Sequence, residues 1–415
     1  MSSIKINIPK DVAHIIYVLE QNGHEAFAVG GCVRDAIMGR EPHDWDITTS
    51  ANPEQVKALF KRTIDTGIQH GTVTVMINST GYEVTTYRID GIYTDGRHPE
   101  QVTFTSNLVE DLKRRDFTIN AMAYNDRVGI VDQFGGIDDL KHKIIRCVGI
   151  ATERFTEDAL RIFRAIRFSA QLGFSIEDNT ADAIVALGSS LTKISKERIQ
   201  TELDKLITSS HPDRLELIDM YGLGQYIFEG AIALNRPNPT LYKNISLTMN
   251  MLPTDHYLRT AALLIYEEQP KTVLKKLKLD NSTIDICGKL CALKDIPIPA
   301  DKPALRRIIV KYGRDIFDRY AFTFIDALIK SNIYKCISIN ELNTIQSVYQ
   351  DIINSKDCIS LKDMQITGSD LMDIGIPQGK ELGVILNRLF EKVLDDPSLN
   401  NRETLLNLVS HVSSQ

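Results

Sequence analysis

The chain has 415 residues and a mass of 46.7 kDa, a length that suggests roughly two to four domains. Hydrophobic residues make up 43% and charged residues 25%, as in globular chains that bury a core, and no stretch approaches the ~18 consecutive apolar residues of a membrane span. The net charge of −6 lacks the basic surplus of many nucleic-acid-binding proteins, although a local basic track can still bind phosphates. Scattered cysteines without a CxxC pair, and a start without a signal pattern, predict a reduced, cytoplasmic protein with no membrane partner.

Residues 1–146 alternate short β-type runs with helical runs. This pattern predicts an α/β or α+β domain with a small sheet. Asn52 and Pro53 are typical of the cap and the first position of a helix. The expected elements are, in chain order, a strand at Ala26–Gly30, a helix at Cys32–Gly39, a strand at Asp44–Thr48, a helix at Asn52–Phe60, and a hairpin of Thr72–Ile77 and Tyr82–Arg88 around residues 79–81.

Strand signals stop near residue 150, and most of the remainder has helical spacing. The clearest segments are Thr152–Phe168, Ser195–Ile207 and Asp213–Met220. Prolines at 253, 297, 299 and 377 interrupt the pattern, and no fixed repeat is present. The second part is therefore expected to be all-helical, in two or three subdomains.

Two glycines and two aspartates form the first chemical motif. Gly30 and Gly31 stand between an expected strand and helix, where backbone N–H groups can approach a phosphate. Asp44 and Asp46 alternate on a strand, so both carboxylates point to one side and can share Mg²⁺. Two metal ions suit nucleotidyl transfer because they activate a phosphate and neutralise the leaving pyrophosphate. Glu83 is the candidate third carboxylate; the structural alternative is a solvated strand end.

The basic run at residues 113–121 carries the second motif. Arg114 and Arg115 offer forked donors for phosphate oxygens. Asp116 and Asn120 lie four residues apart, so on a helix they would share a face and could hold ribose hydroxyls. The alternative is a capped amphipathic helix with a basic start, which would oppose the helix dipole unless an anion were bound.

A third motif lies in residues 157–168. Apolar residues fall on one side of a helix, and the charged ones, Glu157, Asp158, Arg161, Arg164 and Arg167, fall on the other. One interpretation is a surface helix with ion pairs between successive turns. A sharper one is base selection: a carboxylate beside a guanidinium, such as Asp158 with Arg161, matches the hydrogen-bonding edges of cytosine and adenine. Uracil and guanine would leave buried groups unpaired there, and such mispairing discriminates strongly.

A glycine turn, Gly375-Ile-Pro-Gln-Gly379-Lys380, precedes a strongly amphipathic stretch at Leu382–Leu394. Such a turn can seat a nucleic-acid phosphate at a helix start, or it can be a plain joint between helices.

Together these segments resemble the tRNA nucleotidyltransferase family, the CCA-adding enzymes of the bacterial class II type. The resemblance is close over residues 20–210 and looser around 361–408. The first motif of the family is similar to Gly30–Asp35 with Asp44-Trp-Asp46, and the second to Arg114–Ala121. Asp132–Leu140 resembles the hinge between head and neck, and Glu157–Arg161 the nucleobase template.

The resemblance implies an α+β fold: a polymerase β-like nucleotidyltransferase head with a small mixed sheet, followed by an all-helical neck, body and tail. The corresponding ranges would be 1–146, 147–220, 221–300 and 301–415. Asp44 and Asp46 would bind Mg²⁺. The residues implied for CTP and ATP are Gly31 and Arg34 on the triphosphate, Asp116 and Asn120 on the ribose, and Arg115, Asp158, Arg161, Arg164 and Arg167 on the remainder of the nucleotide.

The implied reaction is template-independent addition of CCA to the 3′ end of tRNA, whose acceptor arm and elbow the helical part would grip. The stretch Arg88–Pro99 resembles the flexible loop that CC-adding members lack, which favours full CCA addition. A-only addition and poly(A) polymerisation, by members that share the head, stay open as alternatives. Two other classes stay open: a nucleotidyltransferase for a small molecule, which would not need the long helical part, and a silent RNA-binding module, which would not need intact carboxylates. The oligomeric state is open, with a homodimer as one option.

Overall fold

The computed structural model describes residues 4–91 and 102–413, with side chains up to 409. The chain divides into two compact units: Met1–Ser246 with Lys276–Leu279, and Leu247–Lys275 with Asp280–Gln415. This division is coarser than the expected head, neck, body and tail, which stay a prediction. Among the helices of the described part, none has the length and apolar character needed to cross a bilayer.

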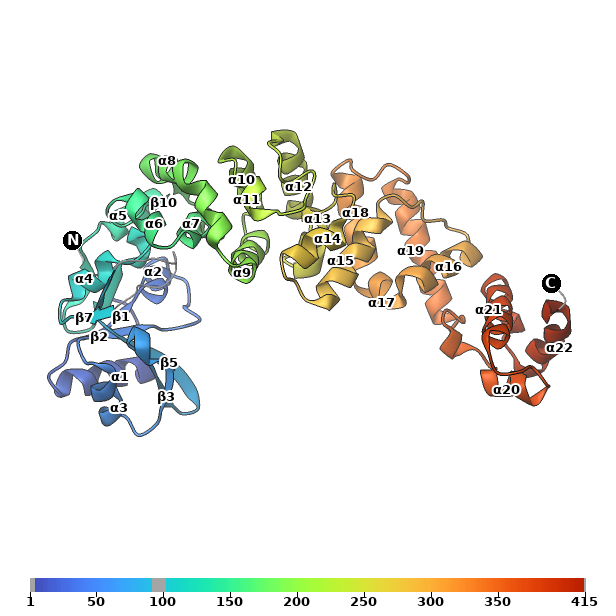
Figure 1. Cartoon of the computed structure of the whole chain (residues 1–415), viewed down its shortest axis with the longest axis horizontal. Coiled ribbons are helices and arrows are strands. Elements are labelled where there is room, and N and C mark those ends of the chain that lie inside the picture. Colours follow the sequence, from blue (N-terminus) through green and yellow to red (C-terminus); the bar gives the residue numbers. More distant parts are fainter. Residues whose placement is uncertain (1–3, 92–101, 414–415) are drawn as a thin grey trace. The chain divides into compact units, whose positions relative to one another are not determined.

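The first unit contains a mixed sheet of seven strands in the order β3-β4-β5-β2-β1-β8-β9 (Figure 1). Only the β2–β5 pair is parallel; the other pairs are antiparallel. Its strands are β1 (Ala26–Val29), β2 (Ile47–Thr49), β3 (Thr63–Gly67), β4 (Thr72–Ile77), β5 (Thr80–Thr86), β8 (Met122–Asn125) and β9 (Gly129–Asp132). Two smaller ladders pair β6 (Arg88–Asp90) with β7 (Val102–Phe104) and β10 (Ile144–Ile145) with β11 (Ser175–Ile176). The α+β class and the small mixed sheet are confirmed.

The first helices of this unit pack on the sheet, and the later ones follow it in the chain. They are α1 (Lys10–Gln21), α2 (Gly31–Ile37), α3 (Pro53–Leu59), α4 (Leu108–Lys113), α5 (Gly136–His142), α6 (Ala151–Glu157), α7 (Leu160–Leu172), α8 (Asp178–Leu187), α9 (Lys196–Ile207), α10 (Glu216–Met220), α11 (Gly224–Ile227) and most of α12 (Pro239–Met251). Because side chains alternate along a strand, β1 can serve two packing layers. Its Phe27 and Val29 join Leu108 and Leu112 of α4 in one apolar cluster, while α1 also packs against β1.

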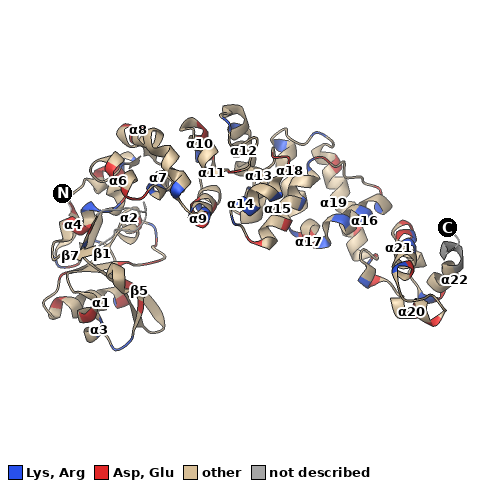
Figure 2. Cartoon of the chain, viewed as in Figure 1, with Lys and Arg blue, Asp and Glu red and all other residues tan. Residues whose placement is uncertain are grey.

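In its described residues the second unit consists of helices and the loops that join them. Its helices are α13 (His256–Leu263), α14 (Pro270–Lys276), α15 (Asn281–Leu293), α16 (Lys302–Tyr312), α17 (Arg314–Ile316), α18 (Phe322–Lys330), α19 (Ile339–Asn354), α20 (Gly368–Asp373), α21 (Lys380–Asp395) and α22 (Arg402–Ser413). α20, α21 and α22 enclose a core of their own around Leu371, Leu389 and Leu405. Both signs of charge are spread over both units (Figure 2), in keeping with the small net charge.

Several expected boundaries differ from the structure. The hairpin turn is at Asn78 and Ser79, both with positive φ, and Gly81 lies inside β5 opposite Met76. Asp44–Thr48 is not one strand, because β2 begins at Ile47. The expected helix at Asp213–Met220 is a 3₁₀ turn, Pro212–Leu215, followed by α10. By contrast, Asn52 caps α3 in a capping box with Gln55, as expected.

Candidate active site

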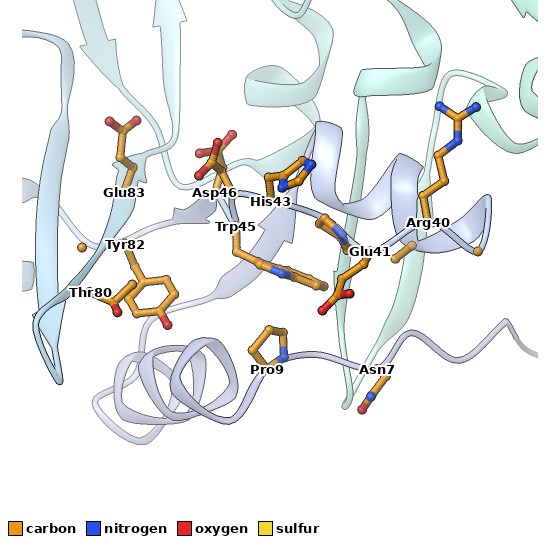
Figure 3. Close-up of a pocket in the computed structure, with 15 residues that line it drawn as sticks. Asn7, Pro9, Arg40, Glu41, His43, Trp45, Asp46, Thr80, Tyr82 and Glu83 are labelled. Carbon is orange, nitrogen blue, oxygen red and sulfur yellow. The ribbon is translucent and has the colours of Figure 1, made fainter. Parts of the chain in front are cut away.

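A pocket of about 1020 Å³ opens beside the strand β2 (Figure 3). Asp44, Asp46 and Glu83 are among the residues that line it. The other lining residues are Asn7, Pro9, Ala36, Gly39, Arg40, Glu41, Pro42, His43, Trp45, Thr80, Gly81 and Tyr82. The three carboxylates predicted from the sequence therefore face one cavity.

Backbone geometry explains how these carboxylates meet. Figure 3 shows the Asp46 carboxylate and the Trp45 ring on opposite sides of the chain, and Trp45 is only 9% exposed. Alternation along extended backbone puts Asp44 on the same side as Asp46. β2 runs parallel to β5 with Ile47 opposite Val84, so Glu83 lies on the strand next to Asp46.

Charge repulsion acts among the three acids. The pKa of Asp46 is raised by the crowding of protein atoms around its carboxyl and by Asp44, while Arg115 opposes the rise. The pKa of Glu83 is raised by burial and by the charges of Asp46 and Asp44. A divalent cation would relieve this repulsion, and hard carboxylate oxygens suit Mg²⁺. In the described residues, no three His, Cys, Asp or Glu side chains converge closely enough to hold a metal, so metal binding stays a prediction.

The turn at Gly30 and Gly31 joins β1 to α2, as expected. Gly30 has φ +83°, a conformation that residues with a side chain rarely adopt, and a Cβ there would stand 3.0 Å from Arg115 Nη1. A Cβ on Gly31 would stand 3.6 Å from Arg34 Nη2. Two guanidiniums thus lie against the glycine backbone, an arrangement suited to phosphate oxygens.

Arg34 connects the glycine turn to other parts of the first unit. It donates to Asn120 Oδ1 at 2.6 Å and pairs with Asp35 at 2.9 Å. Its guanidinium carbon lies 5.3 Å from the centre of the Phe168 ring. The same ring stacks with Arg167 at 3.6 Å and approaches Arg164 at 5.4 Å. Three predicted nucleotide-binding arginines therefore share one aromatic platform.

The basic run at residues 113–115 lies at the C-terminal end of α4, not at a helix start. The expectation of a conflict with the helix dipole was wrong, because cations are favourable at this end. Asp116 and Asn120 do meet, with Asn120 Nδ2 donating to Asp116 Oδ1 at 3.1 Å, but through a 3₁₀ turn at Thr118–Asn120.

Asp116 is buried and receives two hydrogen bonds from Arg164, at 2.9 and 2.6 Å. Burial alone would raise the pKa of Asp116, but the Arg164 charge and hydrogen bonds hold it well below the ordinary carboxyl range. Asp116 is therefore ionised at neutral pH and fixes a guanidinium of α7 to the segment that follows α4.

The helix expected at Thr152–Phe168 is broken. α6 ends at Glu157, Asp158 has extended backbone angles, and α7 begins at Leu160. Asp158 Oδ1 accepts from the Leu160 N–H at 3.0 Å, and its Oδ2 pairs with Arg198 at 2.8 Å. The Asp158 carboxylate thus bonds to the first residue of the second helix and to α9 at once, through the break between α6 and α7.

Arg161 has partners other than the Asp158 carboxylate. It pairs with Glu157 at 2.6 Å and donates to the carbonyls of Arg154 and Arg114, at 3.1 and 2.9 Å. Arg161 and Arg167 are both buried, so the interpretation of this segment as an ordinary surface helix was wrong. Arg167 pairs with Glu202 of α9 at 2.7 Å.

Sequence reasoning missed four residues of this cluster: Asp111, Phe168, Arg198 and Glu202. The sequence interpretation gave Phe168 no role beyond the end of the third motif, although an aromatic ring directly after Arg167, in a segment rich in arginine, was a signal. Arg198 and Glu202 lie on another helix, and only the fold brings them here. In the second unit, α21 begins at Lys380 directly after Gly379, as the glycine-turn motif predicts, but no binding role follows from this alone.

Three family models match the chain. Residues 26–146 match the "Poly A polymerase head domain", residues 173–234 the "Probable RNA and SrmB-binding site of polymerase A", and residues 257–409 "tRNA nucleotidyltransferase domain 2 putative". Fold and site thus define a nucleotidyltransferase with a polymerase-type head, a class that generally uses divalent metal ions.

Relatives that match almost the whole length of the chain identify one family within this class. The CCA-adding enzyme of Levilactobacillus brevis is 38% identical over 407 residues, which covers 95% of this chain and 96% of the relative. That of Streptococcus pyogenes is 37% identical over 395 residues, 94% of both chains. The chain belongs to the CCA-adding enzyme family.

Solved structures agree on the fold. The Bacillus stearothermophilus CCA-adding enzyme in complex with CTP is 32% identical, with a TM-score of 0.80 and 96% of both chains covered. The Thermotoga maritima CCA-adding enzyme complexed with tRNA is 20% identical, with a TM-score of 0.65 over 98% of this chain and 97% of that one, and supports the fold alone.

Proposed function

We propose that this protein adds C, C and A to the 3′ end of tRNA without a nucleic-acid template, using CTP and ATP and releasing pyrophosphate. The observation that carries the proposal is one contiguous site in which three carboxylates, a glycine turn and an arginine cluster lie in a chain related to CCA-adding enzymes along its whole length. The reaction belongs in the cytoplasm, where the six free cysteines stay reduced.

Asp44 and Asp46 are the proposed ligands of Mg²⁺, with Glu83 as a third carboxylate. When bound, the metal ions neutralise charge on the phosphates and activate the terminal 3′-hydroxyl. The protein contributes positioning and electrostatics, because the step needs no covalent enzyme intermediate. The backbone at Gly31 and the guanidiniums of Arg34 and Arg115 are placed to orient the triphosphate.

The ribose is assigned to the head and the base to the neck. Asp116 and Asn120, which bond to each other, would bind the ribose hydroxyls. Asp158 and Arg161 would select the base, and Arg164 and Arg167 would also contact the incoming CTP or ATP. In the described structure the two selecting side chains pair with Arg198 and Glu157, so an incoming cytosine or adenine would exchange with these partners.

The remaining parts of the chain would hold the RNA. We assign residues 1–146 to the head, 147–220 to the neck, 221–300 to the body and 301–415 to the tail, with the acceptor arm and elbow of tRNA as the partner of the helical part. The residue limits of the polymerase-head family model support the first boundary. The part of the Arg88–Pro99 loop beyond residue 91 lies outside the described residues.

The decisive assay supplies tRNAs that end at the discriminator base, at C, and at CC, with CTP and ATP given separately. Full CCA addition predicts that CTP extends the first two substrates and ATP extends only the third. Extension of the third substrate alone would assign A-only addition, and long A tracts on any RNA would assign poly(A) polymerisation.

Two variants test the assigned roles. Asp44→Ala should abolish incorporation while tRNA binding, measured by filter retention, stays intact; retained turnover would refute the metal assignment. Arg161→Ala should relax discrimination against UTP, because a mispaired buried donor no longer penalises uracil. A lower rate with unchanged selectivity would refute base selection by this residue.

A further inference from the structure

Asp111 is a buried, charged residue beside the candidate active site, and the proposed reaction gives it no role. It lies on α4, is 0% exposed and does not line the pocket. Its Oδ1 accepts from Arg114 Nε at 3.0 Å and Arg114 Nη2 at 2.7 Å. Its Oδ2 accepts from Arg115 Nη2 at 3.3 Å and from the Thr48 hydroxyl at 3.2 Å. One carboxylate therefore accepts four hydrogen bonds from three residues.

These donors come from separate parts of the site. Thr48 lies on β2, two residues after Asp46. Arg115 stands against the backbone of Gly30. The carbonyl of Arg114 accepts from Arg161 Nη2 at 2.9 Å, which reaches the base-selecting segment. Asp111 thus ties together the strand after the metal-binding acids, the phosphate-binding turn and α7.

The charge of Asp111 also affects how Arg115 interacts with Asp46. Arg115 already lowers the pKa of Asp46, so its charge acts on that carboxylate. The buried Nε of Arg115 has no hydrogen-bond partner in the described structure, so the guanidinium is not saturated by its present contacts. Burial alone would raise the pKa of Asp111, but Arg115 and Arg114 lower it, which keeps it charged at neutral pH. Asp46 is the other carboxylate on which the Arg115 charge acts, and its backbone carbonyl accepts from the Val29 N–H at 2.9 Å, next to the Gly30 backbone that Arg115 lies against.

We propose that Asp111 is a positioning residue that holds Arg115 beside Gly30 and prevents it from pairing with Asp46, so that Asp46 stays free to bind metal. This inference rests on the proposed function of Asp46 and Arg115. It predicts that the charge of Asp111 governs metal affinity although Asp111 cannot touch the metal.

The test measures Mn²⁺ binding by electron paramagnetic resonance, which needs no turnover. Asp111→Asn keeps the shape of the side chain and removes its charge. We expect Mn²⁺ affinity to fall about five- to tenfold, the order of one charge–charge interaction at ~4 Å in a water-like dielectric. In an Arg115→Met background the same Asp111→Asn change should leave Mn²⁺ affinity unaltered, because no guanidinium is left to capture Asp46.

Asp139 offers a matched control. It is a buried aspartate with the same kinds of partner, the Thr118 hydroxyl at 2.6 Å and Arg146 at 3.1 Å, and like Asp111 it does not line the pocket. Unlike Arg115, Arg146 is not among the charges that act on Asp46. Asp139→Asn should lower the melting temperature without changing Mn²⁺ affinity. If Asp111→Asn behaves in the same way, or weakens Mn²⁺ binding equally in both backgrounds, the proposal is wrong.

A conservative variant covers the case in which Asp111→Asn does not fold. Asp111→Glu keeps the charge and shifts it by one methylene, so Mn²⁺ affinity should stay within about twofold of the parent while KM for CTP rises. Loss of Mn²⁺ binding in Asp111→Glu would overturn the proposal. Unchanged Mn²⁺ binding in Asp44→Ala and Asp46→Ala would instead refute the proposed metal site itself, which keeps the two failures distinct.

Discussion

The Asp116–Arg164 pair allows a quantitative prediction that links α7 to the segment after α4. Replacing Asp116 by Asn keeps the shape of the side chain and removes the charge that faces Arg164. The Asp116 side chain is 9% exposed and that of Arg164 is 33% exposed, so the pair is neither fully buried nor a surface bridge. Asn120 and the Phe117 N–H also donate to Asp116, at 3.1 and 2.8 Å, and an amide oxygen can still accept those bonds.

The magnitude follows from this partial burial. At an effective dielectric constant of about 20, two charges ~4 Å apart interact with ~4 kcal/mol. Removing one partner of a fully buried pair costs about 3–5 kcal/mol, and the solvent that reaches Arg164 reduces this to about 2–3 kcal/mol. At about 2–4 °C per kcal/mol for a unit of this size, the first unit should melt roughly 5–10 °C lower.

Differential scanning calorimetry of Asp116→Asn, Arg164→Met and the double variant measures the coupling directly. We expect a coupling free energy of about 1–2 kcal/mol together with a higher KM for both CTP and ATP. Asp138→Asn is the control, because its partner Lys141 is 63% exposed and Asp138 is 74% exposed; it should leave the melting temperature unchanged. A coupling below about 0.5 kcal/mol would refute the reasoning.

Further predictions concern pH, charge repulsion and backbone space. Because the pKa values of Asp111 and Asp116 are lowered in the folded state, the stability they supply is fully present above the ordinary carboxyl pKa and is lost as the pH falls from there through the lowered pKa of the folded state. The melting temperature should be flat from about pH 7 to 5 and drop below about pH 4, less steeply in Asp116→Asn. The raised pKa of Asp46 has the opposite sign, so Asp46→Asn should melt at a higher temperature than the parent in metal-free buffer at pH 7, and Mg²⁺ should stabilise only the parent. A Cβ on Gly136 would stand 2.4 Å from the Thr118 carbonyl oxygen, so Gly136→Ala should lower the melting temperature, whereas Gly129→Ala, with open space but positive φ, should have a smaller effect.

Sequence patterns predicted the elements that are specified by interactions between residues close together in the chain. Asn52 and Pro53 mark the start of α3, and alternating residues mark β4. The sequence predicts the hairpin turn at residues 79–81, but the turn residues are Asn78 and Ser79, and Gly81 pairs within β5. Glycine is needed there for space, since a Cβ would stand 2.8 Å from Thr74 Cγ2, while Asn78 and Ser79 supply the positive φ angles.

Tertiary contacts explain most of the site that the sequence did not reveal. The break at Asp158 contains no glycine or proline; its carboxylate is held by Arg198, 40 residues further along. The residue types needed for metal, phosphate and base recognition were identifiable from their spacing. Which carboxylate faces which guanidinium was not, because Asp111, Glu202 and Arg198 act through neighbours that only the fold assembles.

The strand order of the sheet also determines when the sheet can fold during synthesis of the chain. β1 is an inner strand, and one of its neighbours is β8, where Ala28 lies opposite Tyr124. Contacts between residues so far apart in the chain form slowly, because a long loop must close first. A nascent chain therefore cannot complete its sheet until β9, which ends at Asp132, has left the ribosome. The helices that follow make mostly contacts between residues closer together in the sequence. We therefore expect the slow folding step to involve the first third of the chain. Until β8 pairs with it, one edge of β1 is exposed.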